Sequence, residues 1–307
     1  MEQLPSMNLN LKVGDPQQKS NIVVFFLSSD EKKNDNYLSL SQGLDQNLVN
    51  ISEIDKKEFF LNLKVTNNSS QNLLLLGGEE LIGYKIKQNR IVATTSIIPS
   101  HSSAIISVNC GEKRRWSPLL NDTIKSSNTL FFSRQNLGRQ SKIWSEIKDL
   151  SDKLKVKTFT FSVEDIYKKK EKSLKEIENF FKPTPGAIGV VVAINNQIKT
   201  LDVFSNEHML KVYLKKIIRS VAINNFKKIN YKSYLKIKDV HKFLRLIHQS
   251  NKRECKINKG TLGKIIRFNG GSINGTTFYN EKNEVVHCSA FSKDIMVYGT
   301  EKEYYAA

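Results

Sequence analysis

The stretch IGVVVAINNQIKTLDVF (188–204) contains two apolar runs separated by the polar pair Asn195-Asn196. Branched apolar residues favour extended backbone, and a two-residue polar turn between two such runs is typical of a β-hairpin. We therefore predict two antiparallel strands, over 188–194 and 197–204.

Helices are expected on both sides of the hairpin. Before it, residues 139–154 and 163–182 place apolar side chains three and four positions apart, as on one face of a helix. After it, Ser205 is the expected N-cap of a helix over 206–222, and residues 239–250 have the same amphipathic pattern. The middle of the chain is therefore predicted to be helical.

Both ends of the chain have the pattern of strands and turns, apart from a short helix expected over 39–49. In EFFLNLKVTN (58–67), alternation places Leu61, Leu63 and Val65 on one face. The predicted class is α+β, with a sandwich- or barrel-like β-rich N-terminal part, a helical middle and a β-rich C-terminal part. The other expected strands are 22–27, 73–78, 91–99, 104–110, 263–268, 275–280 and 284–291.

The composition excludes several classes of protein. With 307 residues, 39% of them hydrophobic, the chain is long and apolar enough for a buried core. It has no apolar run of membrane-spanning length and no signal peptide, so we expect a cytoplasmic protein that does not bind membranes. Cys110, Cys255 and Cys288 lie far apart, which predicts no metal site by spacing, and Cys110 and Cys288 are expected to be small core residues.

The positive charge is distributed unevenly. Lys and Arg number 48 against 30 Asp and Glu, for a net charge of +18. Residues 1–120 contain 13 basic and 12 acidic residues, whereas residues 151–260 contain 25 and 10. Such an asymmetry is compatible with a nucleic-acid-binding surface, but solvent-facing helices coated with Lys are the favoured interpretation. Only nine of the basic residues are Arg, which disfavours nucleic-acid recognition.

The densest polar constellation is LLLLGGEELIGYKIKQNRIV (73–92). Glu79 and Glu80 can serve as a general acid and base or accept hydrogen bonds from ribose hydroxyls. Arg90 offers a planar fork suited to a phosphate or a carboxylate. The alternative interpretation is an ordinary hairpin with an exposed charged turn.

Two further segments carry candidate residues. In VNCGEKRRW (108–116), Trp116 lies beside guanidinium groups and can stack on a base, although a basic loop with a packing indole is the favoured interpretation. In EVVHCSAF (284–291), His287 has apolar neighbours, so the alternative to a functional role is a satisfied core histidine. No standard nucleotide-binding or hydrolase motif occurs in the chain.

The order of these segments resembles one prokaryotic family, the ADP-ribosylglycohydrolase-and-rhodanese-phosphatase-associated (ARPP) domain family. The resemblance covers roughly 37–292, after an N-terminal extension with the first strand (1–36) and before a C-terminal tail (293–307). The domain is expected as one unit or as two lobes, 37–136 and 137–292. About two extra residues precede Gln88, so the family's lysine matches either Lys85 or Lys87. The resemblance rests on LLLLGGEELIGYKIKQNRIV, VNCGEKRRW, GVVVAINNQIKTLDVF, KGTLGKIIRF and VVHCSAF.

The resemblance implies a domain for nucleotide ligands, an enzyme or a sensor of NAD-derived or ADP-ribose-like molecules in a stress or anti-phage system. An enzyme of this kind would be a hydrolase or a transferase, and no cofactor is assigned. The alternatives are a nucleic-acid-binding protein that uses 151–260, and a non-catalytic component that binds a protein partner or a second copy of itself. The implied catalytic residues are Glu79, Glu80 and His287, and the implied ligand-binding residues are Lys85, Gln88, Asn89, Arg90, Glu112, Trp116 and Asp202.

Overall fold

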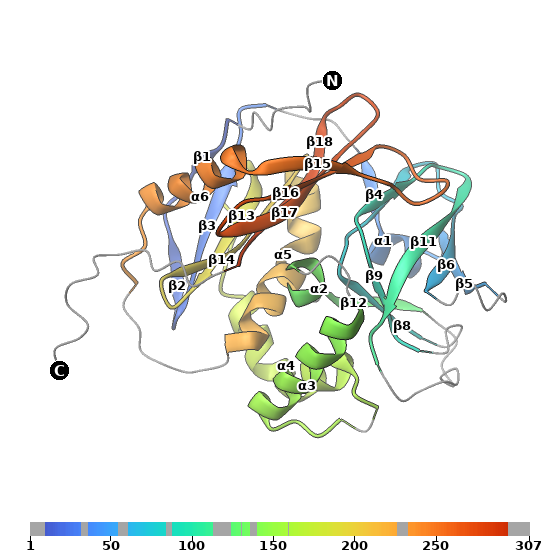
Figure 1. Cartoon of the computed structure of the whole chain (residues 1–307), viewed down its shortest axis with the longest axis horizontal. Coiled ribbons are helices and arrows are strands. Elements are labelled where there is room, and N and C mark those ends of the chain that lie inside the picture. The colour runs from blue at the N-terminus through green and yellow to red at the C-terminus, as the bar shows by residue number, and fades with distance from the viewer. Residues whose placement is uncertain are drawn as a thin grey trace. The chain divides into compact units, whose positions relative to one another are not determined.

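The computed structural model confirms the α+β class, with strand-rich ends and a helical middle (Figure 1). The chain forms two compact units. Unit 1 comprises residues 1–35, 176–255 and 264–307, and unit 2 comprises 36–175 and 256–263. The lobe boundary expected at 136–137 stays a prediction. The structure describes residues 10–31, 36–54, 61–83, 88–112, 124–129, 131–135, 140–158, 160–225 and 233–293.

The predicted hairpin lies in the sheet of unit 1, to which the described residues contribute nine strands. Asn195 and Asn196 have φ angles of 50° and 59°, as the two-residue turn of a twisted hairpin requires. The strand order is β1-β3-β13-β14-β18-β17-β16-β15, with β2 also paired to β3, and all neighbours are antiparallel. The strands are β1 Lys12–Val13, β2 Gln17–Lys19, β3 Ile22–Ser28, β13 Ala187–Ile194, β14 Gln197–Phe204, β15 Asn251–Cys255, β16 Lys264–Asn269, β17 Ile273–Tyr279 and β18 Val285–Ser292.

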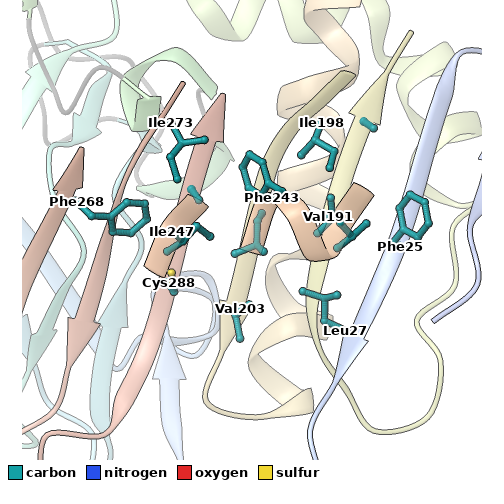
Figure 2. Close-up of a cluster of buried hydrophobic side chains, with 14 of the residues drawn as sticks. Phe25, Leu27, Val191, Ile198, Val203, Phe243, Ile247, Phe268, Ile273 and Cys288 are labelled. Carbon is teal, nitrogen blue, oxygen red and sulfur yellow. The ribbon is translucent and has the colours of Figure 1, made fainter. Parts of the chain in front are cut away.

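The two faces of this sheet pack against different helices. Side chains alternate along β14, so Val203 joins the core that contains α6 (Ile237–Gln249), whereas Phe204 stacks on Tyr213 of α5 (Glu207–Ala222). Figure 2 shows Val203 in the first of these cores, together with Phe243 of α6. Because both faces are covered, Thr200 and Asp202 of β14 are buried, as are the polar side chains of β18.

The expected N-cap of α5 was wrong by one residue. Asn206 caps the helix, because its side-chain oxygen accepts a hydrogen bond from the Met209 amide at 2.9 Å. Ser205 instead continues the pairing of the strands, since its amide donates to the Val286 carbonyl. A short 3₁₀ helix, η2 Ile223–Asn225, follows α5.

Unit 2 contains two sheets around a core of its own. The described residues form a three-stranded sheet in the order β10-β7-β4 and a six-stranded sheet in the order β12-β8-β9-β11-β6-β5. The strands are β4 Tyr37–Ser39, β5 Val49–Glu53, β6 Asn62–Asn67, β7 Asn72–Leu75, β8 Glu79–Ile82, β9 Arg90–Val92, β10 Ser96–Ile98, β11 Ser102–Cys110 and β12 Lys125–Thr129. The remaining helices are α1 Leu40–Asp45, α2 Phe131–Gln135, α3 Gln140–Leu154 and α4 Val163–Glu178.

Three expectations for this region need correction. Residues 91–99 do not form one strand but end β9 and form β10, which belong to different sheets. Leu61 precedes β6 and is 40% exposed, so the buried face begins with Leu63 and Val65. The short helix expected over 39–49 ends at Asp45, and Val49 already belongs to β5. No helix among the described residues is long and apolar enough to cross a membrane.

Candidate functional site

The polar constellation of residues 73–92 lies inside the six-stranded sheet of unit 2. Glu79 and Glu80 begin β8, which pairs with β9 on one side and with β12 on the other. Arg90 begins β9, which pairs with β11 on its other side. All three charged side chains are at most 2% exposed. Their burial contradicts the alternative interpretation in which they form an exposed charged turn.

Glu79 holds the turn that leads into β8. Its two carboxylate oxygens accept hydrogen bonds from the Leu76 amide at 2.8 Å and from the Ser126 hydroxyl at 2.9 Å. Gly78 lies in this turn with a φ of 90°, which side chains other than glycine rarely adopt. The contacts of Glu79 thus connect the turn to β12, and they explain its full burial as a structural role.

Glu80 is in a different electrostatic situation. Burial is the main cause that raises the pKa of Glu80 to about 8; the negative charges of Glu164 and Glu112 act in the same direction, and hydrogen bonds from Asn128 and Asn89 act in the opposite direction. The Asn89 Nδ2 atom lies 3.5 Å from Oε1 of Glu80, and Oε2 has no hydrogen-bond partner among the residues that the structure describes. At neutral pH Glu80 is therefore mostly a neutral carboxylic acid that can donate a proton.

Asn89 connects Glu80 to two other chain segments. Its backbone amide donates to Oε1 of Glu112 at 2.7 Å, and its side chain lies 3.4 Å from the Ser162 hydroxyl. The Gly111 amide donates to the Asn89 carbonyl at 2.7 Å. Asn89 and Glu112 are each 2% exposed, so a buried polar network surrounds Glu80.

The first two turns of α4 add two acidic residues and one cation near Glu80. Lys168 forms a 2.6 Å ion pair with Glu164, and hydrogen bonding to Glu164 raises the pKa of Lys168, with the charges of Asp165 and Glu80 acting in the same direction. Burial raises the pKa of Asp165, and the charges of Glu164 and Glu112 add to this effect. The surroundings of Glu80 are thus predominantly anionic, which favours proton donors such as hydroxyl groups over phosphates.

The Arg90 guanidinium forms hydrogen bonds within the protein. Its guanidinium donates to Oε1 of Glu53 and to Sγ of Cys110, each at 3.1 Å. Burial raises the pKa of the Cys110 thiol although Arg90 lowers it, which fits the expectation that Cys110 is a small core residue. The side-chain amide of Gln140 accepts a hydrogen bond from the Cys110 backbone amide and donates one to the Cys110 carbonyl. The phosphate-binding role of Arg90 stays a prediction.

Gln88, Lys85 and Trp116 are the remaining predicted residues of this part of the chain. Gln88 is fully buried, and neither atom of its side-chain amide has a hydrogen-bond partner within the described ranges. Lys85 and Trp116 lie outside the described residues. Their expected contacts with phosphate and base stay predictions.

Asp202 and His287 form a second buried pair, in unit 1. The His287 Nε2 atom lies 3.0 Å from Oδ1 of Asp202, and Thr200 donates to Oδ2 at 3.3 Å. Phe204 lies opposite His287 in the pairing of β14 with β18, and the two rings are 4.7 Å apart. Both members of the pair are at most 1% exposed. The neighbouring Cys288 belongs to the other face, where burial raises its pKa to about 12 and keeps it an unreactive thiol.

The structure therefore divides the predicted site residues between two units. Glu79, Glu80, Gln88, Asn89, Arg90 and Glu112 belong to unit 2, and Asp202 and His287 belong to unit 1. Within the described ranges, no three His, Cys, Asp or Glu side chains are placed as ligands of a metal ion. No sequence motif pointed to four other members of the network around Glu80, which come from distant segments: Asn128, Ser162, Glu164 and Lys168.

Comparison with known proteins tests the family resemblance. Searches of the curated proteins and of the solved structures found no significant match. A scan against protein families matches residues 10–291 to the ARG and Rhodanese-Phosphatase-superfamily-associated Protein domain, ARPP-1. The match covers nearly the whole chain and confirms the resemblance inferred from the motifs. The chain therefore belongs to the ARPP-1 domain family.

Proposed function

We propose that this chain is a domain for nucleotide ligands that acts on, or senses, NAD-derived or ADP-ribose-like molecules, with Glu80 as the proton donor of the site. The family's association with ADP-ribosylglycohydrolase and rhodanese-phosphatase genes gives the ADP-ribose context. The observation that carries the proposal is the fully buried Glu80, whose pKa of about 8 keeps its proton available at neutral pH.

The chemistry of Glu80 suits a glycosidic bond to ribose. When the bond joins ribose to an oxygen of the departing group, its cleavage leaves negative charge on that oxygen, and the proton of a neutral carboxylic acid can neutralise it. The sugar develops positive charge in the same step, which nearby carboxylates stabilise. Glu112 and Glu164 are the carboxylates whose charges reach Glu80. A hydrolase would pass the sugar to water, and a transferase would pass it to another acceptor.

The anionic surroundings of Glu80 also indicate how a ligand would be oriented. Carboxylates accept hydrogen bonds from ribose hydroxyls and repel phosphates. We therefore expect the ribose, and not the diphosphate, to lie next to Glu80 and Glu112. The diphosphate would need cations from elsewhere, and Lys85, Lys87 or Arg90 supply them in the proposal.

A ligand and product screen tests this function. ADP-ribose, NAD and cyclic ADP-ribose are each added to the wild type, to Glu80→Gln and to Glu281→Gln, a control at an exposed turn. Melting temperature reports binding, and chromatography reports products. We expect the wild type and the control to bind at least one nucleotide. If turnover occurs, Glu80→Gln should reduce it by roughly 10²-fold or more, the usual contribution of a general acid.

The outcomes separate the enzyme from the sensor. Binding without product would identify a sensor, in which Glu80→Gln weakens binding but changes no chemistry. The proposal fails if no nucleotide shifts the melting temperature of the wild type and none is converted. It also fails if Glu80→Gln behaves like the wild type in both measurements.

A further inference from the structure

The outer face of α6 carries a row of exposed cations, and the inner face of the same helix packs into the core of unit 1. Lys238, Lys242 and Arg245 follow one another at steps of four and three residues, and all three are exposed. On the opposite side of the helix, Phe243 and Ile247 are fully buried in the core of unit 1 (Figure 2). The packing of α6 therefore holds the three cations in a fixed row toward solvent.

This row has little compensating negative charge. The helix contains one acidic residue, Asp239, which is 4% exposed and accepts a hydrogen bond from the Lys236 amide at 3.0 Å. Only Lys242 approaches it, at 3.7 Å. The exposed His241 and His248 lie beside the row and contribute no negative charge.

Ion pairs one turn apart occur on the other Lys-rich helices. On α4, Lys168 pairs with Glu164 and Lys175 pairs with Glu171, each one turn apart. On α5, Lys211 pairs with Glu207 in the same way. Such pairs neutralise each other locally and are typical of a solvated helix surface. Glu207 is the one acidic residue of α5, which also carries Lys215 and Lys216. The row on α6 therefore differs from the surface of α4, where acidic residues are interleaved with the Lys residues.

An exposed aromatic ring precedes this helix. Tyr234 is 45% exposed, and its backbone amide donates to the side chain of Asn196 at 3.0 Å. Ser233 donates to the same oxygen at 2.9 Å, so the segment that carries the ring is tied to the hairpin turn. The ring and the first cation of the row are four residues apart.

We propose that Tyr234, Lys238, Lys242 and Arg245, here called the α6 surface, bind single-stranded nucleic acid. The cations would follow the phosphodiester backbone, and Tyr234 would stack on an unpaired base, the combination that single-strand binders use. An anionic membrane is the weaker candidate, because the apolar face of α6 is already buried in the core and cannot insert into lipid. This proposal does not depend on the nucleotide site of unit 2.

Binding of a labelled oligo(dT) or oligo(U) strand, measured at several salt concentrations, tests the α6 surface. The variant Lys238→Gln/Lys242→Gln/Arg245→Gln removes three cations. Its matched control, Lys169→Gln/Lys172→Gln/Lys175→Gln, removes three exposed cations from α4. Each single-strand phosphate contact contributes about 0.7 to the slope of log K against log salt, so the first variant should lose about 2 from that slope. The affinity at 0.1 M salt should fall roughly 100-fold.

A second pair of variants separates stacking from charge. Tyr234→Leu should weaken binding roughly tenfold without changing the salt slope, whereas Tyr234→Phe should bind like the wild type. Melting temperatures of all variants establish that each is folded.

Three results would overturn the proposal. The first is a wild type that binds neither strand at low salt. The second is an equal loss of slope in the α4 control, which would mean that overall charge and not the α6 surface attracts the strand. The third is α6-dependent binding to phosphatidylserine vesicles by a protein that ignores both oligonucleotides.

Discussion

Glu79 and Glu80 illustrate how the partners of a buried carboxyl group decide what it does. Glu79 and Glu80 are adjacent and equally buried, yet Glu79 accepts hydrogen bonds from a backbone amide and a hydroxyl, and Glu80 is surrounded by other carboxylates. An ionised Glu80 would be poorly solvated and repelled by its neighbours, so the folded chain favours the protonated form.

The raised pKa of Glu80 predicts how stability depends on pH. The unfolded chain loses this proton near the ordinary pKa of 4.5, whereas the folded chain retains it up to about 8, so the contribution of Glu80 to stability is lost as pH rises between these values. The loss is on the order of 4 kcal/mol at pH 8. Glu80→Gln removes the charge, so its free energy of unfolding should fall less than that of the wild type between pH 5 and pH 8.

Urea denaturation at several pH values measures this difference, with Glu281→Gln as the control. Asp165 also has a raised pKa, but it titrates in all three proteins and cancels in the comparison. Parallel pH profiles for the wild type and Glu80→Gln would contradict the assignment of a raised pKa to Glu80.

The Asp202–His287 pair predicts a strong mutual dependence. Each residue keeps the other hydrogen-bonded inside unit 1, so Asp202→Ala or His287→Ala should each lower the free energy of unfolding by about 2 kcal/mol. The double variant should cost clearly less than the sum of the two, which a double-mutant cycle by chemical denaturation measures. Additive effects would show that the two side chains do not stabilise each other.

The sequence was sufficient to select the candidate residues, but not to predict their hydrogen-bond partners or their burial. Glu79, Glu80 and Arg90 are polar residues inside an apolar stretch, which made them conspicuous. Their partners could not be inferred, because Ser126, Asn128 and Glu164 reach them only through strand pairing and helix placement. The sequence also gives no measure of burial, so it could not distinguish the structural Glu79 from the perturbed Glu80.

Among the secondary-structure elements, β17 shows the tightest packing requirement. A side chain at Gly275 would overlap the Ser289 carbonyl oxygen of β18 and the Phe268 ring of β16. Gly275→Ala should therefore lower the free energy of unfolding by about 3 kcal/mol. Gly271→Ala is the matched control, because a Cβ there meets nothing within 4 Å. Thermal melts of the two variants provide the comparison, and equal melting temperatures would refute the packing argument.

Elements with long periodic patterns were predicted well. The hairpin of β13 and β14, the helices α3 to α6 and the strands β16 to β18 all follow from apolar spacing over seven or more residues or from clear turn signals. The strands β8, β9 and β12 are short and contain charged or small polar residues, so the pattern did not separate them from turns. These strands position Glu80, and the candidate site was therefore the least predictable part of the fold.

The net charge of +18 acts on the whole molecule. Like charges repel in the folded chain, and added salt screens that repulsion within about 10 Å at 0.1 M. Raising sodium chloride from 20 to 200 mM at pH 7 should therefore increase the melting temperature by roughly 2–4 °C. A thermal scan at each salt concentration measures the effect, and an unchanged or lower melting temperature would argue that the cations are already neutralised by partners within the chain.

The two units are built from segments that are distant in the sequence, so local sequence patterns could not predict which residues belong to the same unit. Unit 1 combines the N-terminal strands with the hairpin and the C-terminal strands, and unit 2 takes up a short segment at 256–263. The motifs along the chain place Glu80 and His287 in one series, whereas the fold assigns them to different units. Such an assignment depends on which strands pair, and strand pairing between distant segments is not encoded in local periodicity.

The proposed chemistry requires that Glu80 hold its proton at neutral pH, and infrared difference spectroscopy tests this directly. Subtracting the spectrum of Glu80→Gln from that of the wild type isolates the carbonyl stretch of the protonated Glu80 carboxyl. We expect this band to be present at pH 6 and to disappear with a midpoint near pH 8. If the band is missing at pH 6, Glu80 is already ionised, and the proposed proton donor does not exist.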